Sequence, residues 1–273
     1  LPIFELGHRN TVGDFSYGIS ANFSIINNKV ESLGVGNVQQ PNGLVGDGSS
    51  LFVGYPMQMY YGYVADGVFL DQADIDAWFA HTDQSSLGAN HANTKPGDIR
   101  YKDISGPDGV PDGKVDATYD RVYLGSQIPK YTFGLSLNAA YKGFDLNLFL
   151  QGVAGVKGML NNYSGWAFWS EGNVQKWQME EAFDPKNPER YPGYPRIQNL
   201  GNSVGINNQT SDFWVRNASY LRVKNVQLGY TLPKSVLNGT FISSVRFYLS
   251  AENPLTFHGY PTGWDPEINS GGQ

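Results

Sequence analysis

The stretch from Tyr131 to Gln151, YTFGLSLNAAYKGFDLNLFLQ, decides the fold. Up to Tyr141 every second residue is apolar, and the residues between them are small or polar. After Lys142-Gly143 the alternation resumes, with Phe149 as its exception. A period of two is typical of a strand with one apolar face, and two such runs around a short turn predict a β-hairpin. Each arm is about as long as the ~9 to 11 tilted residues with which a strand crosses a bilayer.

The same alternation recurs in three other segments. It is clear from Phe15 to Ile25 and from Ser244 to Ala251. It is weaker from Ser219 to Tyr230, because Arg222 and Lys224 share a face with the apolar residues of the second half. We interpret this segment as a strand whose charged end lies above the bilayer. The sequence therefore predicts an all-β chain of about five strands.

The connections between these strands differ in length. Lys142-Gly143 and the segment from Pro233 to Ser243 are short, whereas Asn27 to Lys130 and Gly152 to Ala218 are long and polar. Short turns on one side and long loops on the other are typical of an antiparallel transmembrane β-barrel. The alternative is a secreted, soluble β-sandwich that binds glycans or acts in adhesion. Long structureless excursions inside a compact domain count against that alternative.

Composition excludes several other classes of protein. Of the 273 residues 16% are charged and 14% aromatic, and 33 are glycine, a mixture that favours strands and turns over helices. The net charge of -6 argues against nucleic acid as a partner. Because cysteine is absent, disulfides, thiolate nucleophiles and cysteine-ligated metals are excluded. The four histidines are scattered and no hydrolase motif occurs, so we expect no enzyme activity.

An acidic loop between residues 103 and 120 is the one candidate metal site. Hard cations take several oxygen ligands from short loops rich in Asp and Gly, and the spacing here matches a calcium loop in part. The ion would be calcium or magnesium, and its expected ligands are Asp103, Asp108, Asp112, Asp116 and Asp120. The alternative is a solvated loop in which these side chains form Asx turns.

Aromatic residues crowd the second long loop, and we expect them to contact substrate or a partner: Trp166, Phe168, Trp169 and Trp177. Exposed aromatic side chains on a loop can stack on sugar rings or anchor a second protein. The alternative is that they pack the loop on itself.

Ordered blocks along nearly the whole chain carry a family resemblance. They are Tyr61 to Phe69, Pro96 to Asp103, Asp120-Arg121, Gly125, Ile128 to Lys130, Tyr141 to Asp145, Gln151-Gly152, Ala218 to Asn225, Leu228 to Lys234, Ala251 to Pro254 and Asp265 to Glu267. In this order they resemble the C-terminal half of SusC/RagA-type TonB-dependent transporters from the outer membranes of Bacteroidetes. The acidic loop departs from the usual family pattern, with Ser105 where Asn is common.

The resemblance implies a barrel of about twenty-two strands around a plug. It implies a protein of the bacterial outer membrane, in contact with its lipid, that imports oligosaccharides or peptides. The implied partners are TonB, acting through an N-terminal part, and a SusD-like surface lipoprotein. Residues 1–273 are then expected to be a C-terminal part of the barrel domain, without the plug, the TonB box and the last strand. Five strands cannot close a barrel by themselves.

Overall fold

The chain consists of two compact units, each built from separate parts of the sequence. The computed structural model describes residues 2–34, 38–47, 50–200, 205–261 and 263–267. The first unit, here the sheet unit, comprises Leu1–Asn27, Pro129–Val156 and Ala218–Gly259. The second, here the loop unit, comprises Asn28–Ile128, Lys157–Asn217 and Tyr260–Gln273. Within the described ranges, every helix is too short or too polar to cross a bilayer.

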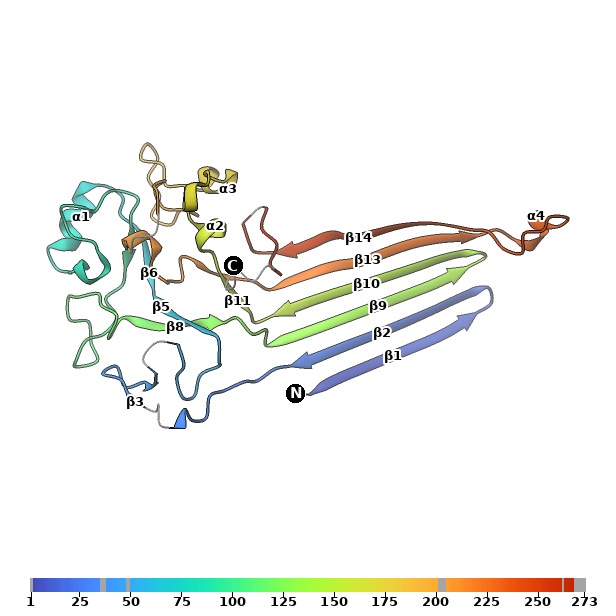
Figure 1. Ribbon diagram of the computed structural model, residues 1–273, viewed down its shortest axis with the longest axis horizontal. Helices are drawn as coiled ribbons and strands as arrows, with labels where there is room; N and C mark the ends of the chain where they lie inside the picture. Colours follow the sequence, from blue (N-terminus) through green and yellow to red (C-terminus); the bar gives the residue numbers. More distant parts are fainter. Residues whose placement is uncertain (1, 35–37, 48–49, 201–204, 262, 268–273) are drawn as a thin grey trace. The chain divides into compact units, whose positions relative to one another are not determined.

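The sheet unit is one antiparallel sheet of six strands in the order β1-β2-β9-β10-β13-β14 (Figure 1). Their bounds are β1 Ile3–Val12, β2 Phe15–Ile25, β9 Tyr131–Tyr141, β10 Phe144–Ala154, β13 Tyr220–Thr231 and β14 Arg246–His258, and the short helix α4, Lys234–Leu237, lies between β13 and β14. All five predicted strands are present, which confirms the expected all-β antiparallel class.

The predicted hairpin forms between β9 and β10. Tyr141 pairs with Phe144, which leaves a two-residue turn. Lys142 and Gly143 both have positive φ, at 46° and 88°. Two positive φ values are the requirement of a type I′ turn, whose twist matches that of the flanking strands.

Strand β1 is the element that the sequence pattern did not predict. It pairs with β2 along its whole length, from Ile3 opposite Ser24 to Val12 opposite Phe15. Its alternation is interrupted because His8 lies opposite Ile19, at a position that is apolar in the neighbouring strands. The His8 ring instead reaches the Tyr17 hydroxyl at 3.3 Å.

The register gives this sheet one apolar and one polar face. One row of directly paired residues crosses all six strands and is apolar throughout: Val12, Phe15, Tyr141, Phe144, Tyr230 and Phe247. A row on the opposite face contains Arg9, Gly18, Asn138, Asn147, Gln227 and Ser250. Because side chains alternate between faces, this register separates the two kinds of residue along each strand.

A β-bulge at Lys224 corrects the prediction for the first half of β13. Asn225 pairs with Phe149 of β10, but Val223 pairs with Leu150, so Lys224 has no opposite residue there. The register of β14 shifts at the same place. One extra residue moves everything before it to the other face. Arg222 therefore leaves the apolar face, where the simple alternation had put it, and is only 4% exposed.

The two long connections are not structureless, because they fold into the loop unit. Its strands are β3 Val38–Gln39, β4 Val45–Gly46, β5 Met59–Tyr63, β6 Ala65–Val68, β7 Ile99–Tyr101, β8 Arg121–Ser126, β11 Lys157–Met159 and β12 Val215–Asn217. Its helices are α1 Gln72–Phe79, α2 Asn162–Gly165 and α3 Lys176–Glu180, with 3-10 turns η2 Ser85–Leu87, η3 Trp169–Glu171 and η4 Ile206–Asn208.

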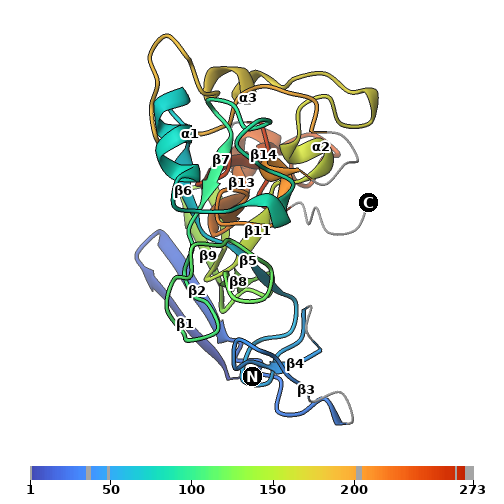
Figure 2. The same ribbon diagram turned by 90° about the vertical axis from the view of Figure 1, so that its left-hand side faces the viewer.

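The buried core lies in the loop unit. Its members come from both long connections and include the fully buried Tyr101, Tyr194 and Trp214. Helix α1 lies beside β6 and β7 (Figure 2). Asp74 of α1 accepts hydrogen bonds from Arg100 of β7 at 3.1 Å and from Arg190 at 2.6 and 3.1 Å. Ion pairs and aromatic packing thus hold the first long connection in a defined structure, although its composition is that of a loop.

Candidate functional site

The acidic loop directs its carboxylates at the backbone. Asp103 accepts hydrogen bonds from the N–H of Gly113 at 2.6 Å and of Asp112 at 3.4 Å. Asp112 accepts one from Lys114, and Asp116 accepts two, from Thr118 and Tyr119. The bonds of Asp112 and Asp116 are the Asx turns of the alternative interpretation, whereas those of Asp103 join two distant parts of the loop.

Asp120 is the buried centre of this loop. Its carboxylate accepts hydrogen bonds from the N–H groups of Ile104 at 2.7 Å, Ser105 at 3.2 Å and Asp116 at 2.8 Å. Burial raises the pKa of the Asp120 carboxyl, and the three N–H groups offset only part of that rise. Asp120 therefore closes the loop between its two ends.

As arranged, these five aspartates do not fit a calcium site. A calcium ion requires six to eight oxygens that point to one centre. Across the part of the chain that the structure describes, His, Asp and Glu side chains form no group of three or more that could hold a metal ion. Asp108 is exposed at the tip of the loop. A cation at Asp103, Asp108, Asp112, Asp116 and Asp120 stays a prediction.

The aromatic residues of the second long connection divide into buried and exposed ones. Trp177 is 3% exposed, packs edge-on against Tyr194 at 5.5 Å and donates to the Gln175 side chain at 2.8 Å. It belongs to the core, which corrects its expected role as a contact residue. Trp166 and Trp169 are partly buried and pack on each other at 5.1 Å. These three rings follow the alternative interpretation, in which the segment packs on itself.

Phe168 is the member of the group that faces solvent. Its side chain is 39% exposed, and its backbone has a φ of 60°. Ser170 and Glu171 also have positive φ, at 47° and 66°. Three residues with positive φ within four positions are unusual, because L-amino acids other than glycine rarely adopt this backbone conformation. Backbone strain of this kind is concentrated at functional sites. The contact prediction for this segment therefore narrows to Phe168.

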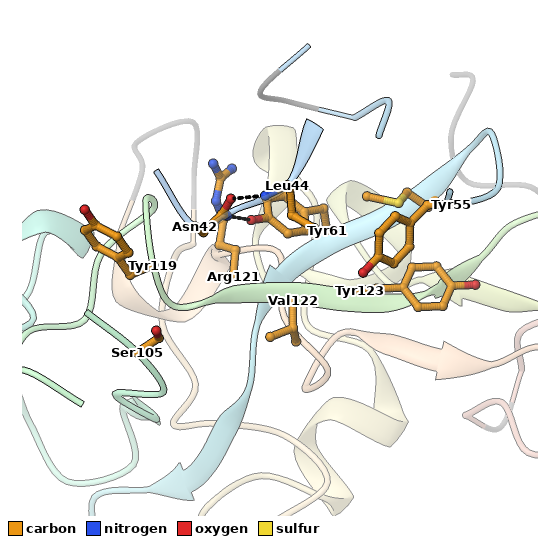
Figure 3. A pocket seen from close by; sticks show the side chains of 10 residues that line it. Asn42, Leu44, Tyr55, Tyr61, Ser105, Tyr119, Arg121, Val122 and Tyr123 are labelled. Carbon is orange, nitrogen blue, oxygen red and sulfur yellow. Dashed lines mark hydrogen bonds between the residues drawn. The ribbon is translucent and has the colours of Figure 1, made fainter. Parts of the chain in front are cut away.

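A pocket of about 260 Å³ lies beside the pair of strands β5 and β8, and the sequence pattern did not predict it (Figure 3). The described residues of its wall include four tyrosines, one arginine and one asparagine: Asn42, Leu44, Tyr55, Met59, Tyr61, Ser105, Tyr119, Arg121, Val122 and Tyr123. Tyr55 and Tyr123 lie side by side, with ring centroids 5.5 Å apart.

A chain of contacts fixes Arg121 in this pocket. The Arg121 guanidinium lies over the Tyr61 ring, 4.8 Å from its centroid, and its Nε donates to the Ala117 carbonyl at 2.7 Å. The Tyr61 hydroxyl accepts a hydrogen bond from the Asn42 amide at 2.6 Å. Burial raises the pKa of Tyr61, although the nearby Arg121 charge opposes the rise.

Pairing between distant segments creates this pocket, which is why sequence reasoning missed it. Tyr61 pairs with Tyr123 and Tyr63 with Arg121, so Arg121 is the diagonal neighbour of Tyr61. The two strands are separated by α1 and the acidic loop. The dense tyrosines between Tyr55 and Tyr63 were a usable signal for an aromatic site, but the arginine that completes it was not visible from them.

Curated proteins similar to this chain are TonB-dependent receptors. The TonB-dependent receptor P3 of Formosa agariphila is 30% identical over 278 residues, which cover 97% of this chain and 25% of that protein. The TonB-dependent receptor SusC of Bacteroides thetaiotaomicron is 26% identical over 263 residues, or 94% of this chain and 23% of that protein. The chain thus spans about a quarter of these relatives. No family model matches it.

Solved structures show the same fold. The RagAB peptide importer in its open-open state superposes with a TM-score of 0.63 at 24% identity, over 97% of this chain and 25% of that one. Another structure, of the RagAB peptide transporter, gives 0.61 at 22% identity. These likenesses confirm the predicted barrel-type sheet over the β-sandwich alternative. Over nearly all of its length, this chain is therefore homologous to the SusC/RagA-type TonB-dependent receptors, and it covers about a quarter of their length.

Proposed function

We propose that this chain is part of an outer-membrane transporter, in which the sheet unit crosses the bilayer as a section of a larger barrel. The observation that carries the proposal is the apolar face of the sheet. Leu228, Phe247 and Leu249 are 53%, 63% and 77% exposed on this face. Contiguous apolar surface of this kind marks a membrane or protein interface in a folded protein. In an outer-membrane barrel it lies against lipid, and the polar face lines the interior.

The proposed cargo is an oligosaccharide or a peptide. The relatives are named as receptors, and one structural neighbour is named as a peptide importer. Transport of this kind needs no catalytic group, in keeping with the absence of hydrolase motifs from the sequence. The whole protein would be energised by TonB and would work with a SusD-like lipoprotein.

Site-directed labelling tests the membrane placement. The chain contains no cysteine, so single cysteines can be introduced in pairs on opposite faces. In the full transporter, Leu148→Cys should react with a thiol reagent dissolved in the lipid phase, and Asn147→Cys should not, because neighbouring residues face opposite sides of the sheet. The same reactivity at both positions, or the reverse order, would contradict the proposal.

Uptake by the parent bacterium tests the import function. Deletion of the gene should abolish uptake of one class of labelled oligomer and leave the other unchanged, and the gene supplied in trans should restore it. If uptake of both classes persists in the deletion strain, the proposed cargo is wrong, whatever the labelling result.

A further inference from the structure

The tyrosine pocket of the loop unit has the chemistry of an anion site. Among the described residues that line it, Arg121 is the cation and none is a carboxylate. Among the residues that the structure describes, no acidic group lies within ion-pair distance of the Arg121 guanidinium. The described lining of the pocket therefore carries one positive charge, in a chain whose net charge is -6.

Arg121 is oriented but keeps unused donors. Its Nε donates to the Ala117 carbonyl, and its guanidinium lies over the Tyr61 ring. Its two terminal nitrogens form no hydrogen bond within the described ranges of the chain. A planar guanidinium can donate two parallel N–H groups to the two oxygens of a carboxylate. Binding then costs less side-chain entropy when the guanidinium is already held in place.

The nearby aspartates do not pair with these Arg121 donors. Their carboxylates accept hydrogen bonds from backbone N–H groups instead. Asp103, Asp116 and Asp120 all accept main-chain N–H groups within the acidic loop. The same loop contributes Ser105 and Tyr119 to the pocket wall. The acidic loop therefore lies beside the pocket, and none of these three carboxylates forms an ion pair with Arg121.

The rest of the wall is suited to a small ring or chain behind the charged group. Tyr123 is 42% exposed and packs beside Tyr55, and Leu44 and Met59 add apolar surface. The volume of about 260 Å³ lies below the roughly 300 Å³ at which pockets for drug-sized ligands begin. The pocket can therefore hold one residue of an oligomer.

We propose that this pocket binds a carboxylate carried by one residue of the transported oligomer. Arg121 donates to the carboxylate, Tyr55 and Tyr123 cover the body of that residue, and Asn42 and Tyr61 position the guanidinium. The inference rests on the proposed import function. The carboxylate can come from two sources, a uronic acid of an oligosaccharide or the C-terminus of a peptide.

Calorimetric titration of the purified full transporter tests the inference with four ligands. These are an oligogalacturonate trimer and its methyl ester, and a tripeptide with a free C-terminus and its C-terminal amide. We expect one acid to bind at least about tenfold more tightly than its neutral partner, because a hydrogen-bonded charge contributes more than a neutral group. The preferred acid identifies the source.

Arg121→Gln should remove this preference by weakening the acid about tenfold to a hundredfold while the neutral partner binds as before. Arg121→Lys should give an intermediate affinity, because it keeps the charge and loses the fork. Lys186→Gln, at an exposed position of the same unit, changes the net charge equally and should have no effect.

Two results would overturn the inference: wild-type protein without any preference for either acid, or Arg121→Gln with unchanged preference. Neither result affects the lipid labelling of the sheet unit, so failure of this inference can be separated from failure of the transport proposal. Circular dichroism of each variant shows whether the fold is retained, and the Arg121→Lys series keeps the test valid if Arg121→Gln assembles poorly.

Discussion

Leu148 of β10 lies directly opposite Val226 of β13, and the adjacent pair, Asn147 and Gln227, lies on the other face of the same two strands. Asn147 and Leu148 are the fourth and fifth of the 11 residues of β10, so these two rows lie near the middle of the strand. The two rows thus offer adjacent positions on the same pair of strands whose side chains point to opposite faces of the sheet.

Val226→Arg should therefore impair the protein much more than Gln227→Arg. A charge on the lipid face near the middle of a bilayer costs about 2 to 4 kcal/mol, whereas the interior face tolerates polar residues. Urea unfolding of the full transporter in lipid vesicles measures the difference in the free energy of unfolding. An equal loss of unfolding free energy in both variants would mean that the two faces do not contact different environments, lipid on one side and water on the other.

The bulge at Lys224 gives a second prediction. Deleting Lys224 should disrupt assembly, because the residues before it would move by one position and place Arg222 on the apolar face. Lys224→Ala keeps the extra residue and should assemble normally. Heat-modifiability on gels, a common test of barrel closure, compares the two variants, and normal closure of the deletion variant would show that the bulge is dispensable.

Hairpin β9–β10 and the bulge show which parts of the fold were predictable. Alternation and a Lys-Gly turn are local, so Tyr131 to Gln151 could be assigned from the sequence. The bulge depends on the register with two neighbouring strands, which shifts between Val223 and Asn225, and β1 carries His8 and Asn10 where its neighbours are apolar. Neither the bulge nor strand β1 produces a regular alternation of apolar and polar residues in the sequence.

The site was less predictable than the sheet, because it depends on contacts between distant segments. Arg121 meets Tyr61 only because β5 pairs with β8, and Trp177 is buried only because Tyr194 and Trp214 close over the same core. Composition drew attention to the aromatic segment, but it could not separate a core tryptophan from an exposed phenylalanine. The spacing of the aspartates suggested a metal loop, but it fits backbone capping equally well.

Trp177→Ala and Phe168→Ala should separate structure from contact in the aromatic segment. Truncating a buried tryptophan leaves a cavity and costs about 3 to 5 kcal/mol, whereas an exposed position changes stability by about 0.5 kcal/mol or less. Chemical denaturation of the full protein measures both. We expect Phe168→Ala to reduce uptake or lipoprotein association at normal stability, and unchanged activity would remove the last contact residue of this group.

Calcium should bind the acidic loop weakly or not at all. A calcium ion would have to displace the N–H groups that Asp103 and Asp120 already hold, so we expect a dissociation constant no better than roughly 10⁻⁴ to 10⁻³ M. Calorimetric titration of the metal-free protein measures it, with Asp103→Asn as the variant and Glu189→Gln, which removes an exposed carboxylate outside the acidic loop, as the control. Micromolar binding that Asp103→Asn abolishes would establish the predicted site and require the loop to rearrange.

Asp74 should make the loop unit sensitive to acid. Burial raises the pKa of this carboxyl, but hydrogen bonds from Arg190 and Leu70 and the charges of Arg190 and Arg100 together lower it below its ordinary value. A carboxyl whose pKa is lower in the folded state stabilises the fold above its unfolded pKa of about 3.9, and this contribution is lost as the pH falls through the folded pKa. Asp74→Asn should therefore cost about 3 kcal/mol at pH 7, as expected when a largely buried ion pair is broken.

The variant should also lose less additional stability than the wild type between pH 5 and pH 3, because the titrating group is gone. Urea denaturation followed by near-ultraviolet circular dichroism, repeated across this range, gives both quantities. Glu189→Gln removes an exposed carboxyl of the same unit and serves as the control for net charge. If the wild type and Asp74→Asn lose stability in parallel as the pH falls, the Asp74 network does not cause the acid sensitivity, and the two arginines hold α1 by hydrogen bonds alone.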